Sequence, residues 1–173
     1  MSIEKIFVIG GGMMGGGIAQ TAIQSGFHAV LSDTNGPALD RAAAGIEQRL
    51  QGSVDKGRMT REEKDACMSR LSVSDTLLPA TDCDLVIEAI YESLEAKAAL
   101  YVQLEALCRP DAVLASNTSS ISLTALAAGL QRPERFIGMH FFSPVPVMKL
   151  LEVIRGLHTS PETLEAAMET GRR

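Results

Sequence analysis

Residues 6–20, Ile-Phe-Val-Ile-Gly-Gly-Gly-Met-Met-Gly-Gly-Gly-Ile-Ala-Gln, decide the fold of this chain. An apolar run leads into a G-x-G-x-x-G turn and then into a helical pattern, the arrangement that holds a dinucleotide pyrophosphate. Gly10 allows the tight turn, Gly12 lets the backbone approach the phosphates, and Gly15 lets the helix lie close to the strand. The helix N-terminus supplies free N–H donors and a positive dipole end. A glycine turn alone is weak evidence, but here both flanking elements are present.

An acidic residue at the required distance indicates which dinucleotide binds. Asp33 closes the next apolar run, residues 28–31, and lies 23 positions after Gly10. Its carboxylate can accept hydrogen bonds from the adenine-ribose hydroxyls and would repel a 2′-phosphate. No arginine follows in Thr34-Asn35, so we expect NAD rather than NADP. The competing interpretation is a glycine turn beside an ordinary solvated aspartate.

The bulk composition limits the class of protein. The chain has 173 residues, enough for one α/β domain with a substantial core, and we expect a single domain over 1–173. A net charge of −5 argues against nucleic acid or an anionic membrane as the main partner. No apolar run has the length of a membrane span, and no signal peptide fits before the first strand, so we expect a cytoplasmic protein. The three cysteines lack metal-ligand spacing, so we expect reduced packing residues and no metal site, at Cys67, Cys83 and Cys108.

Apolar runs alternate with helical patterns along the chain, which predicts a Rossmann-type, doubly wound α/β fold with a mostly parallel sheet. We predict strands at 3–9, 28–32, 71–74, 84–88, 112–115 and 136–141. We predict helices at 14–25, 92–108 and 122–129. Ligands bind at the carboxyl ends of the strands in such sheets, so residues that directly follow strands are the functional candidates.

Residues 37–70 interrupt this alternation. Apolar side chains repeat there at helical spacing, Gly57 follows as a stop signal, and Thr60-Arg61-Glu62-Glu63 is a capping box for a second helix. We therefore predict a helical hairpin that projects from the sheet. It carries a cationic rim of five residues, namely Arg41, Arg49, Lys56, Arg58 and Arg61. This rim is either a solvated helix face or a contact for a phosphorylated substrate tail.

The C-terminal part of the chain adds a strand of the opposite direction. Only the short, proline-containing segment 143–147 separates the strand at 136–141 from the apolar run at 149–154. Parallel strands need a crossover of a dozen or more residues, so we predict that 149–154 pairs antiparallel as a late addition to the sheet. Ser160 and Pro161 then begin a final helix as its N-cap and first residue.

Two segments bring reactive groups to the ligand edge of the sheet. Residues 116–120, Ser-Asn-Thr-Ser-Ser, follow a strand and supply hydroxyls and an amide. His140 lies in an apolar strand and Glu152 in the neighbouring one, and because a buried glutamate is costly unless paired, we expect the two to pair. The carboxylate would orient the imidazole and favour its protonated form. Such a pair suits an alcohol–ketone interconversion, in which a base removes the hydroxyl proton as hydride passes to nicotinamide, while Ser119 binds the substrate oxygen.

Other interpretations of these residues stay open. A lone histidine in a strand is more often a satisfied core residue, and His28 and His158 have no context that suggests a role. A Ser–His–Glu hydrolase is possible in form, but no G-x-S-x-G elbow surrounds any serine. Glu92 and Lys97 follow the strand at 84–88, where they either touch ribose or nicotinamide or remain surface charges.

Four motifs together resemble the L-3-hydroxyacyl-CoA dehydrogenases, most closely the bacterial 3-hydroxybutyryl-CoA dehydrogenases. They are the glycine turn, residues 82–89, residues 115–120, and His140-Phe141-Phe142 with the segment up to Glu152. The resemblance covers essentially the whole chain. It implies NAD-dependent oxidation of (3S)-3-hydroxyacyl-CoA to 3-oxoacyl-CoA, with acyl-CoA as the substrate.

The resemblance also implies roles for individual residues. His140 matches the catalytic base of the family, Glu152 its partner, and Ser119 the serine that contacts both substrate and nicotinamide. The cofactor contacts fall on Gly10, Gly12, Met14, Gly15, Asp33, Glu92, Lys97, Ser119 and Ser143. The helical hairpin of the family contacts the CoA tail, for which Lys56 is the best match. Arg49 aligns with a family serine on that hairpin, so this contact is not carried over.

The sequence departs from the family pattern in two places. Ser143 replaces an asparagine that contacts the cofactor, so we expect altered rather than abolished binding. The family continues into a helical domain that supplies the homodimer interface, closes over the substrate and contributes a catalytic asparagine. Without that domain, we expect the chain to bind NAD but to turn over poorly. The alternatives are a dehydrogenase of a free hydroxy acid, such as a sugar acid, and a non-catalytic NAD-binding module.

Overall fold

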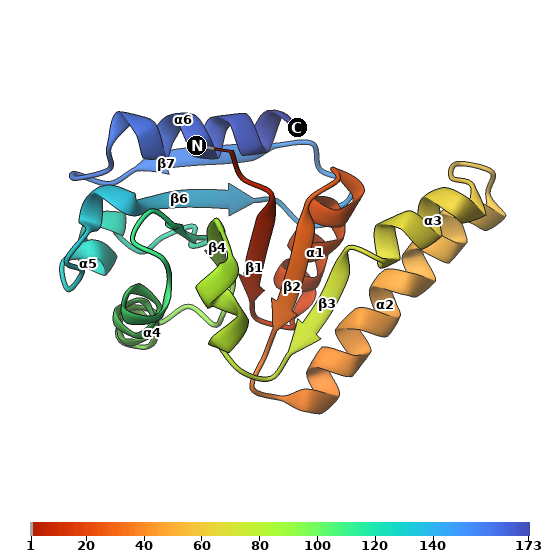
Figure 1. The fold of residues 1–173 in the computed structure, drawn as a ribbon, viewed down its shortest axis with the longest axis horizontal. Helices are drawn as coiled ribbons and strands as arrows, with labels where there is room; N and C mark the ends of the chain where they lie inside the picture. The colour runs from red at the N-terminus through yellow and green to blue at the C-terminus, as the bar shows by residue number, and fades with distance from the viewer. Residues whose placement is uncertain (1) are drawn as a thin grey trace.

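A single seven-stranded sheet forms the centre of the protein, in the order β3-β2-β1-β4-β5-β6-β7 (Figure 1). The computed structural model describes residues 2–173. The strands are β1 (Lys5–Ile9), β2 (His28–Ser32), β3 (Leu71–Ser74), β4 (Leu85–Glu88), β5 (Val113–Ser116), β6 (Phe136–Phe141) and β7 (Leu151–Arg155). Neighbouring strands from β3 to β6 pair parallel, and β7 pairs antiparallel with β6. The predicted doubly wound sheet with a late antiparallel strand is confirmed.

Within residues 2–173, five α-helices and two 3₁₀ turns connect these strands, and a sixth α-helix follows the last strand. The helices are α1 (Met13–Gln24), α2 (Gly36–Asp55), α3 (Arg61–Met68), α4 (Leu94–Leu107), α5 (Leu123–Ala127) and α6 (Pro161–Arg172). The 3₁₀ turns are η1 (Leu78–Asp82) and η2 (Pro133–Arg135), neither of which the sequence pattern indicated. Helices α2 and α3 form a hairpin that projects away from the sheet (Figure 1). The predicted capping box is present, because the Thr60 hydroxyl accepts the Glu63 N–H and the Glu63 carboxylate accepts the Thr60 N–H.

The side chains of each central strand alternate between the two faces of the sheet, and each face has its own hydrophobic core. Along β1, Ile6 and Val8 pack on the face covered by α1, α2, α3 and α6, whereas Phe7 and Ile9 pack on the face covered by α4 and α5. Each such side chain contributes about 1.5–3 kcal/mol when it is fully buried. A sheet covered on both faces leaves only its edges and strand ends for a ligand, which places the candidate site at the carboxyl ends of the parallel strands.

The three cysteines are free and buried, as the sequence predicted. Burial raises the pKa of the Cys83 and Cys108 thiols to about 11, and it also raises the pKa of Cys67. Within residues 2–173, no group of three or more His, Cys, Asp or Glu side chains is placed to hold a metal ion. No helix of this described part combines the length and apolar character needed to cross a membrane.

Candidate active site

The glycine turn joins β1 to α1 at the carboxyl edge of the sheet, and its conformation requires glycine at two positions. Gly10 adopts φ +112°, and a Cβ there would lie 2.5 Å from the carbonyl oxygen of Ala89, the residue that directly follows β4. A Cβ at Gly15 would lie 1.8 Å from the carbonyl oxygen of Gly10. Both positions must therefore lack a side chain for α1 to begin directly beside the end of β1.

The start of α1 is suited to bind an anion. Gly12 is the N-cap, and no side chain caps the helix or places a negative charge in its first turn. A Cβ at Gly12 would meet no atom within 4 Å, so the backbone here is open to a ligand. The first N–H groups of α1 and the positive end of its dipole are therefore available to a pyrophosphate.

Asp33 is held in place at the end of β2 beside the glycine turn. Its Oδ2 accepts the backbone N–H of Gly11 at 2.7 Å, and its Oδ1 accepts the N–H of Asn35 at 2.8 Å. A carboxylate oxygen has two lone pairs, so each oxygen retains capacity for a ribose hydroxyl. This fixed carboxylate together with the open helix start fits the adenosine and pyrophosphate parts of NAD.

A first cavity, of about 640 Å³, extends from the glycine turn along the groove between α1 and α2. Asp33, Arg41, Arg49 and the segment 144–146 line it together with the turn. The Nε of Arg49 donates to Gln20 Oε1 at 2.5 Å across the two helices, and burial lowers the pKa of this guanidinium.

The cationic rim therefore divides into two groups. Arg41 and Arg49 line the first cavity, whereas Lys56 caps the far end of α2. The 20 residues of α2 span roughly 30 Å, and Lys56 follows at the C-terminal end of this helix. Arg58 lies in the turn that joins α2 to α3, and Arg61 begins α3. Helical spacing in the sequence does not separate these two groups. A contact between Lys56 and the substrate stays a prediction.

A second cavity, of about 460 Å³, lies on the other side of the glycine turn and gathers half of the predicted site residues. It is bounded by α1, by the ends of β4, β5 and β6 and by the start of α4. The predicted residues that line it are Met14, Glu92, Lys97, Ser119, His140 and Ser143. Asn117 also lines it, although the sequence analysis assigned this residue no individual role. Met13 lines the first cavity and Met14 the second, so a dinucleotide that crosses the turn would reach both.

His140 and Glu152 form a cross-strand pair at the edge of the second cavity. They are direct partners in the β6–β7 register, and Nδ1 of His140 lies 2.9 Å from Oε2 of Glu152. The His140 side chain is 19% exposed, but that of Glu152 is 54% exposed, so the expectation of a buried glutamate was wrong. Antiparallel register, rather than the cost of burial, brings the two together, because directly opposite residues project from the same face. When Nδ1–H donates to the carboxylate, Nε2 of the neutral ring keeps a free lone pair.

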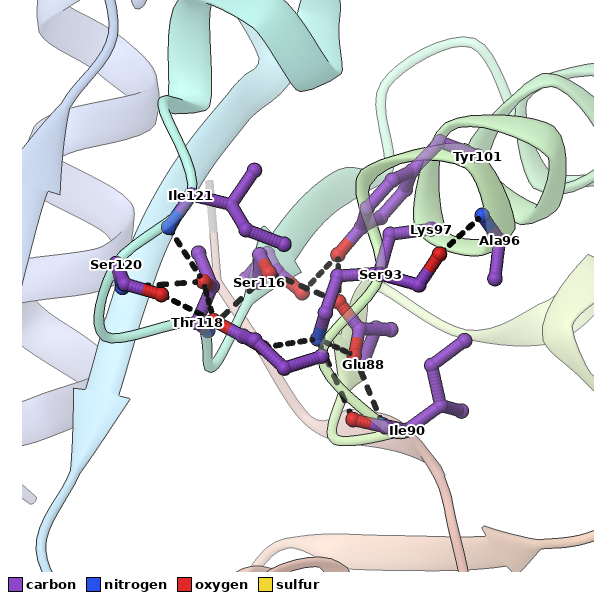
Figure 2. Close-up of polar contacts among 12 residues, drawn as sticks. Glu88, Ile90, Ser93, Ala96, Lys97, Tyr101, Ser116, Thr118, Ser120 and Ile121 are labelled. Carbon is purple, nitrogen blue, oxygen red and sulfur yellow. Dashed lines mark hydrogen bonds and ion pairs between the residues drawn. The ribbon is translucent and has the colours of Figure 1, made fainter.

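Beneath the cavity lies a buried ion pair that the sequence analysis missed (Figure 2). The side chains of Glu88 and Lys97 are 0% and 1% exposed, and Lys97 Nζ lies 2.5 Å from Glu88 Oε1. The other Glu88 oxygen accepts from the Tyr101 hydroxyl at 3.1 Å and the Ser116 hydroxyl at 2.8 Å. Burial and the neighbouring Glu88 raise the pKa of Tyr101. The interpretation of Lys97 as a surface charge was therefore wrong, and the available signal was a single glutamate in the apolar run 85–88.

Glu92 links this ion pair to the loop that carries Ser119. Its Oε2 lies 3.2 Å from Lys97 Nζ, and its Oε1 accepts from the hydroxyls of Thr118 and Ser120. Partial burial opposes the charge of Glu92, but hydrogen bonds from Thr118 and Lys97 outweigh it and hold the pKa of this carboxyl below its ordinary value. The charged carboxylate of Glu92 thus holds the loop that carries Ser119 at the cavity.

Comparison with known proteins gives the family. Residues 5–173 match the family model of the 3-hydroxyacyl-CoA dehydrogenase, NAD binding domain. The chain belongs to this family. NAD, the cofactor expected from the glycine turn and Asp33, is the one that this family of domains binds.

Individual members of the 3-hydroxyacyl-CoA dehydrogenase family are similar to almost the whole chain. A probable 3-hydroxybutyryl-CoA dehydrogenase of Bacillus subtilis is 47% identical over 163 residues, which are 94% of this chain and 57% of that protein. The 3-hydroxybutyryl-CoA dehydrogenase of Bradyrhizobium diazoefficiens is 46% identical over 167 residues, 96% of this chain and 57% of that protein. A crystal structure of 3-hydroxybutyryl-CoA dehydrogenase from Escherichia coli K12 superposes with a TM-score of 0.97 at 44% identity, over 99% of this chain and 36% of that one. The chain thus spans less than two thirds of the length of these relatives.

Proposed function

We propose that the protein takes part in the NAD-dependent oxidation of (3S)-3-hydroxyacyl-CoA to 3-oxoacyl-CoA. The observation that carries this proposal is the His140–Glu152 pair, which borders the same cavity as Ser119 and Met14. Met14 belongs to the start of α1, where the pyrophosphate of NAD fits. A base, a hydroxyl group and the cofactor end of the glycine turn are therefore within one site.

His140 acts as the general base in this proposal. Bound NAD supplies the hydride acceptor for the carbon that bears the hydroxyl group. Nε2 of His140 takes the hydroxyl proton, while Glu152 keeps the proton on Nδ1 and stabilises the imidazolium that forms. In the reverse direction the same imidazolium returns the proton to the ketone oxygen. A positioned base of this kind contributes about 10²–10⁴ in rate.

Ser119 and Ser143 orient the reactants. Ser119 lies on the loop after β5, and its hydroxyl group would hydrogen-bond the substrate oxygen that exchanges the proton with His140. Ser143 lies two residues after the end of β6 and lines the same cavity. It would contact the cofactor with a shorter side chain than the asparagine that the family has at this position. Glu92 and Lys97 at the cavity wall complete the proposed cofactor contacts.

The acyl-CoA substrate class follows from the family and from the charge of the groove. The names of the relatives state 3-hydroxybutyryl-CoA as their substrate. Here Arg41 and Arg49 line a groove on an otherwise acidic protein, and Lys56 lies further along the same helix. These cations would bind the phosphates of a CoA tail, which a free hydroxy acid lacks.

The test is NADH consumption with acetoacetyl-CoA by the 173-residue chain, assayed at high enzyme concentration because we expect slow turnover. His140→Gln should lower the rate about 10²-fold or more. NADH binding, followed by fluorescence, should stay within about twofold, because His140 does not contact the glycine turn. His158→Gln is the matched control, since His158 is exposed and outside both cavities.

Three outcomes would contradict this function. Equal rates for the wild-type protein and His140→Gln would remove His140 as the base. Equal rates with acetoacetyl-CoA and with free 3-oxo acids would indicate a dehydrogenase of free hydroxy acids. Background rates with every substrate, together with an NAD-dependent rise in melting temperature, would indicate a non-catalytic NAD-binding module.

A further inference from the structure

Asn117 occupies the point where the parallel ladder between β5 and β6 ends. The last paired residues of the two strands are Ser116 and Gly138. Asn117 directly follows Ser116, and His140 lies two residues beyond Gly138. Both side chains line the second cavity, so the site begins where the backbone pairing of these strands stops.

Beyond the last paired residues, the side chain of Asn117 takes the place of a backbone hydrogen bond between β5 and β6. Its Oδ1 accepts the backbone N–H of Phe141, the residue after His140, at 2.8 Å. Its own backbone N–H donates to the carbonyl oxygen of Glu88 at 2.9 Å. Asn117 therefore ties together the carboxyl ends of β4, β5 and β6. Of the two polar groups of the Asn117 amide, only the oxygen can accept the Phe141 N–H, so the orientation of the amide group is fixed.

The loop that follows Asn117 is already rigid toward β4 and α4. The hydroxyl oxygen of Thr118 accepts the backbone N–H groups of Ser120 at 3.3 Å and Ile121 at 3.0 Å. The same hydroxyl group donates to Glu92, and the Ser120 hydroxyl donates to Glu92 at 3.0 Å. These bonds fix the shape of the loop and its position on one side. Leu123, at the start of α5, packs against Gly138 of β6 at the far end of the loop. Among the described residues, the hydrogen bond from the Phe141 N–H to Asn117 Oδ1 is the one that joins the near end of the loop to β6.

We propose that Asn117 is a positioning residue of the active site. Its side-chain carbonyl group holds the Ser119 loop against the end of β6 and thereby sets the separation between the Ser119 hydroxyl and the His140 imidazole. Both groups must meet one substrate oxygen, and a displacement of about 1 Å can reduce the rate by up to about 10²-fold. The kinetic part of this inference rests on the proposed function, whereas the structural part does not.

Two variants separate the acceptor role of Asn117 from other effects. Asn117→Ala removes the acceptor, while Asn117→Asp keeps an oxygen at the same position and loses the NH₂ group. In Asn117→Ala, the amide hydrogen of Phe141 should exchange about tenfold faster or more, measured by NMR in the presence of NAD. In Asn117→Asp the exchange should stay within about threefold of wild type, because the hydrogen bond is retained.

The kinetic comparison uses the same pair of variants. Asn117→Ala should lower kcat with acetoacetyl-CoA by about 10- to 100-fold while KM for NADH changes by less than about threefold. Asn117→Asp should restore most of kcat. If Asn117→Ala does not fold, Asn117→Ser serves instead, because its hydroxyl oxygen is one bond too short to reach Phe141 N–H.

The inference is overturned if Phe141 exchanges at the same rate in Asn117→Ala and in wild type. It is also overturned if Asn117→Ala and Asn117→Asp lose kcat equally, because the acceptor oxygen would then have no effect on the rate. Absence of turnover in the wild-type protein would contradict the proposed function, and the exchange rates would still decide whether Asn117 holds the loop to β6.

Discussion

Two side-chain pairs, Glu88–Lys97 and Glu152–His140, border the same cavity, and they differ in their access to water. Glu88 and Lys97 lie beneath the cavity, almost wholly excluded from solvent, and Glu88 accepts four hydrogen bonds. Glu152 and His140 lie at the sheet edge, where the glutamate is half exposed. A single hydrogen bond, between His140 Nδ1 and the Glu152 carboxylate, joins these two side chains. The first pair holds strand ends, loop and helix together. The second leaves Nε2 free to exchange a proton with a bound molecule.

The comparison shows how one sheet edge can be both rigid and reactive. A buried ion pair costs several kcal/mol of desolvation per ion, which only complete hydrogen bonding offsets, so its geometry tolerates little change. A half-exposed pair contributes about 0–1 kcal/mol to stability and can change its protonation state at small structural cost. In the proposed function, stability and chemistry therefore depend on different pairs, and mutations should separate the two.

Removing one partner of the buried pair should have the largest effect. Lys97→Met leaves Glu88 buried without its cation, so the free energy of unfolding should fall by about 3–5 kcal/mol, measured by urea denaturation. Lys64→Met is the matched control, because Lys64 pairs with the exposed Glu47 at 3.3 Å and should cost about 1 kcal/mol or less. Adding Glu88→Gln to Lys97→Met should recover part of the loss. Equal costs for Lys97→Met and Lys64→Met would erase the difference between the two pairs.

The open pair should show the opposite behaviour. Glu152→Gln keeps the shape of the side chain but no longer stabilises an imidazolium, so kcat with acetoacetyl-CoA should fall by about 10²-fold. The free energy of unfolding should change by less than about 1 kcal/mol. Steady-state kinetics and urea denaturation of the same sample measure both quantities. A large loss of stability with unchanged kcat would mean that Glu152 serves the fold rather than the reaction.

Glu92 is intermediate between the two pairs, and we expect the smallest effect there. The pKa of Glu92 is lowered in the folded protein. Its bonds to Lys97, Thr118 and Ser120 therefore contribute stability at pH values above the pKa of the unfolded chain, about 4.3. This contribution is lost as the pH falls through the lower, folded pKa. The melting temperature of wild type should therefore drop more steeply below about pH 4 than that of Glu92→Gln. Parallel acid profiles for the two proteins would contradict this assignment.

The sequence predicted the fold well because the signals that set it are local. The apolar run 28–32 and the Thr60 capping box each act within a few residues, and the short connection after β6 excluded a parallel partner for β7. Register then placed Glu152 opposite His140, although the prediction relied on burial that the structure does not show. The right pair was thus expected for a partly wrong physical reason.

The parts of the site that the sequence did not reveal depend on contacts between distant elements. Glu88 receives bonds from Lys97 and Tyr101 on α4 and from Ser116 on β5, and no spacing rule connects these positions. Asn117 belonged to a recognised motif, but its bond to Phe141 exists only because β5 and β6 cease to pair at that point. Such contacts follow from the packing of the sheet and not from any single segment.

The antiparallel register of β7 links the His140–Glu152 pair to the hydrophobic core on the other face of the sheet. Leu151 and Val153 pack into the hydrophobic core beneath α6, while Glu152 between them projects to the opposite side of the sheet. A slip of one residue would carry the carboxylate through the sheet, and a slip of two would set Leu150 or Ile154 against His140. The packing of Leu151 and Val153 therefore fixes Glu152 opposite His140, the pair that we propose transfers the proton. Substitutions in this core that contact no reactant would therefore displace Glu152 from His140 and lower the rate.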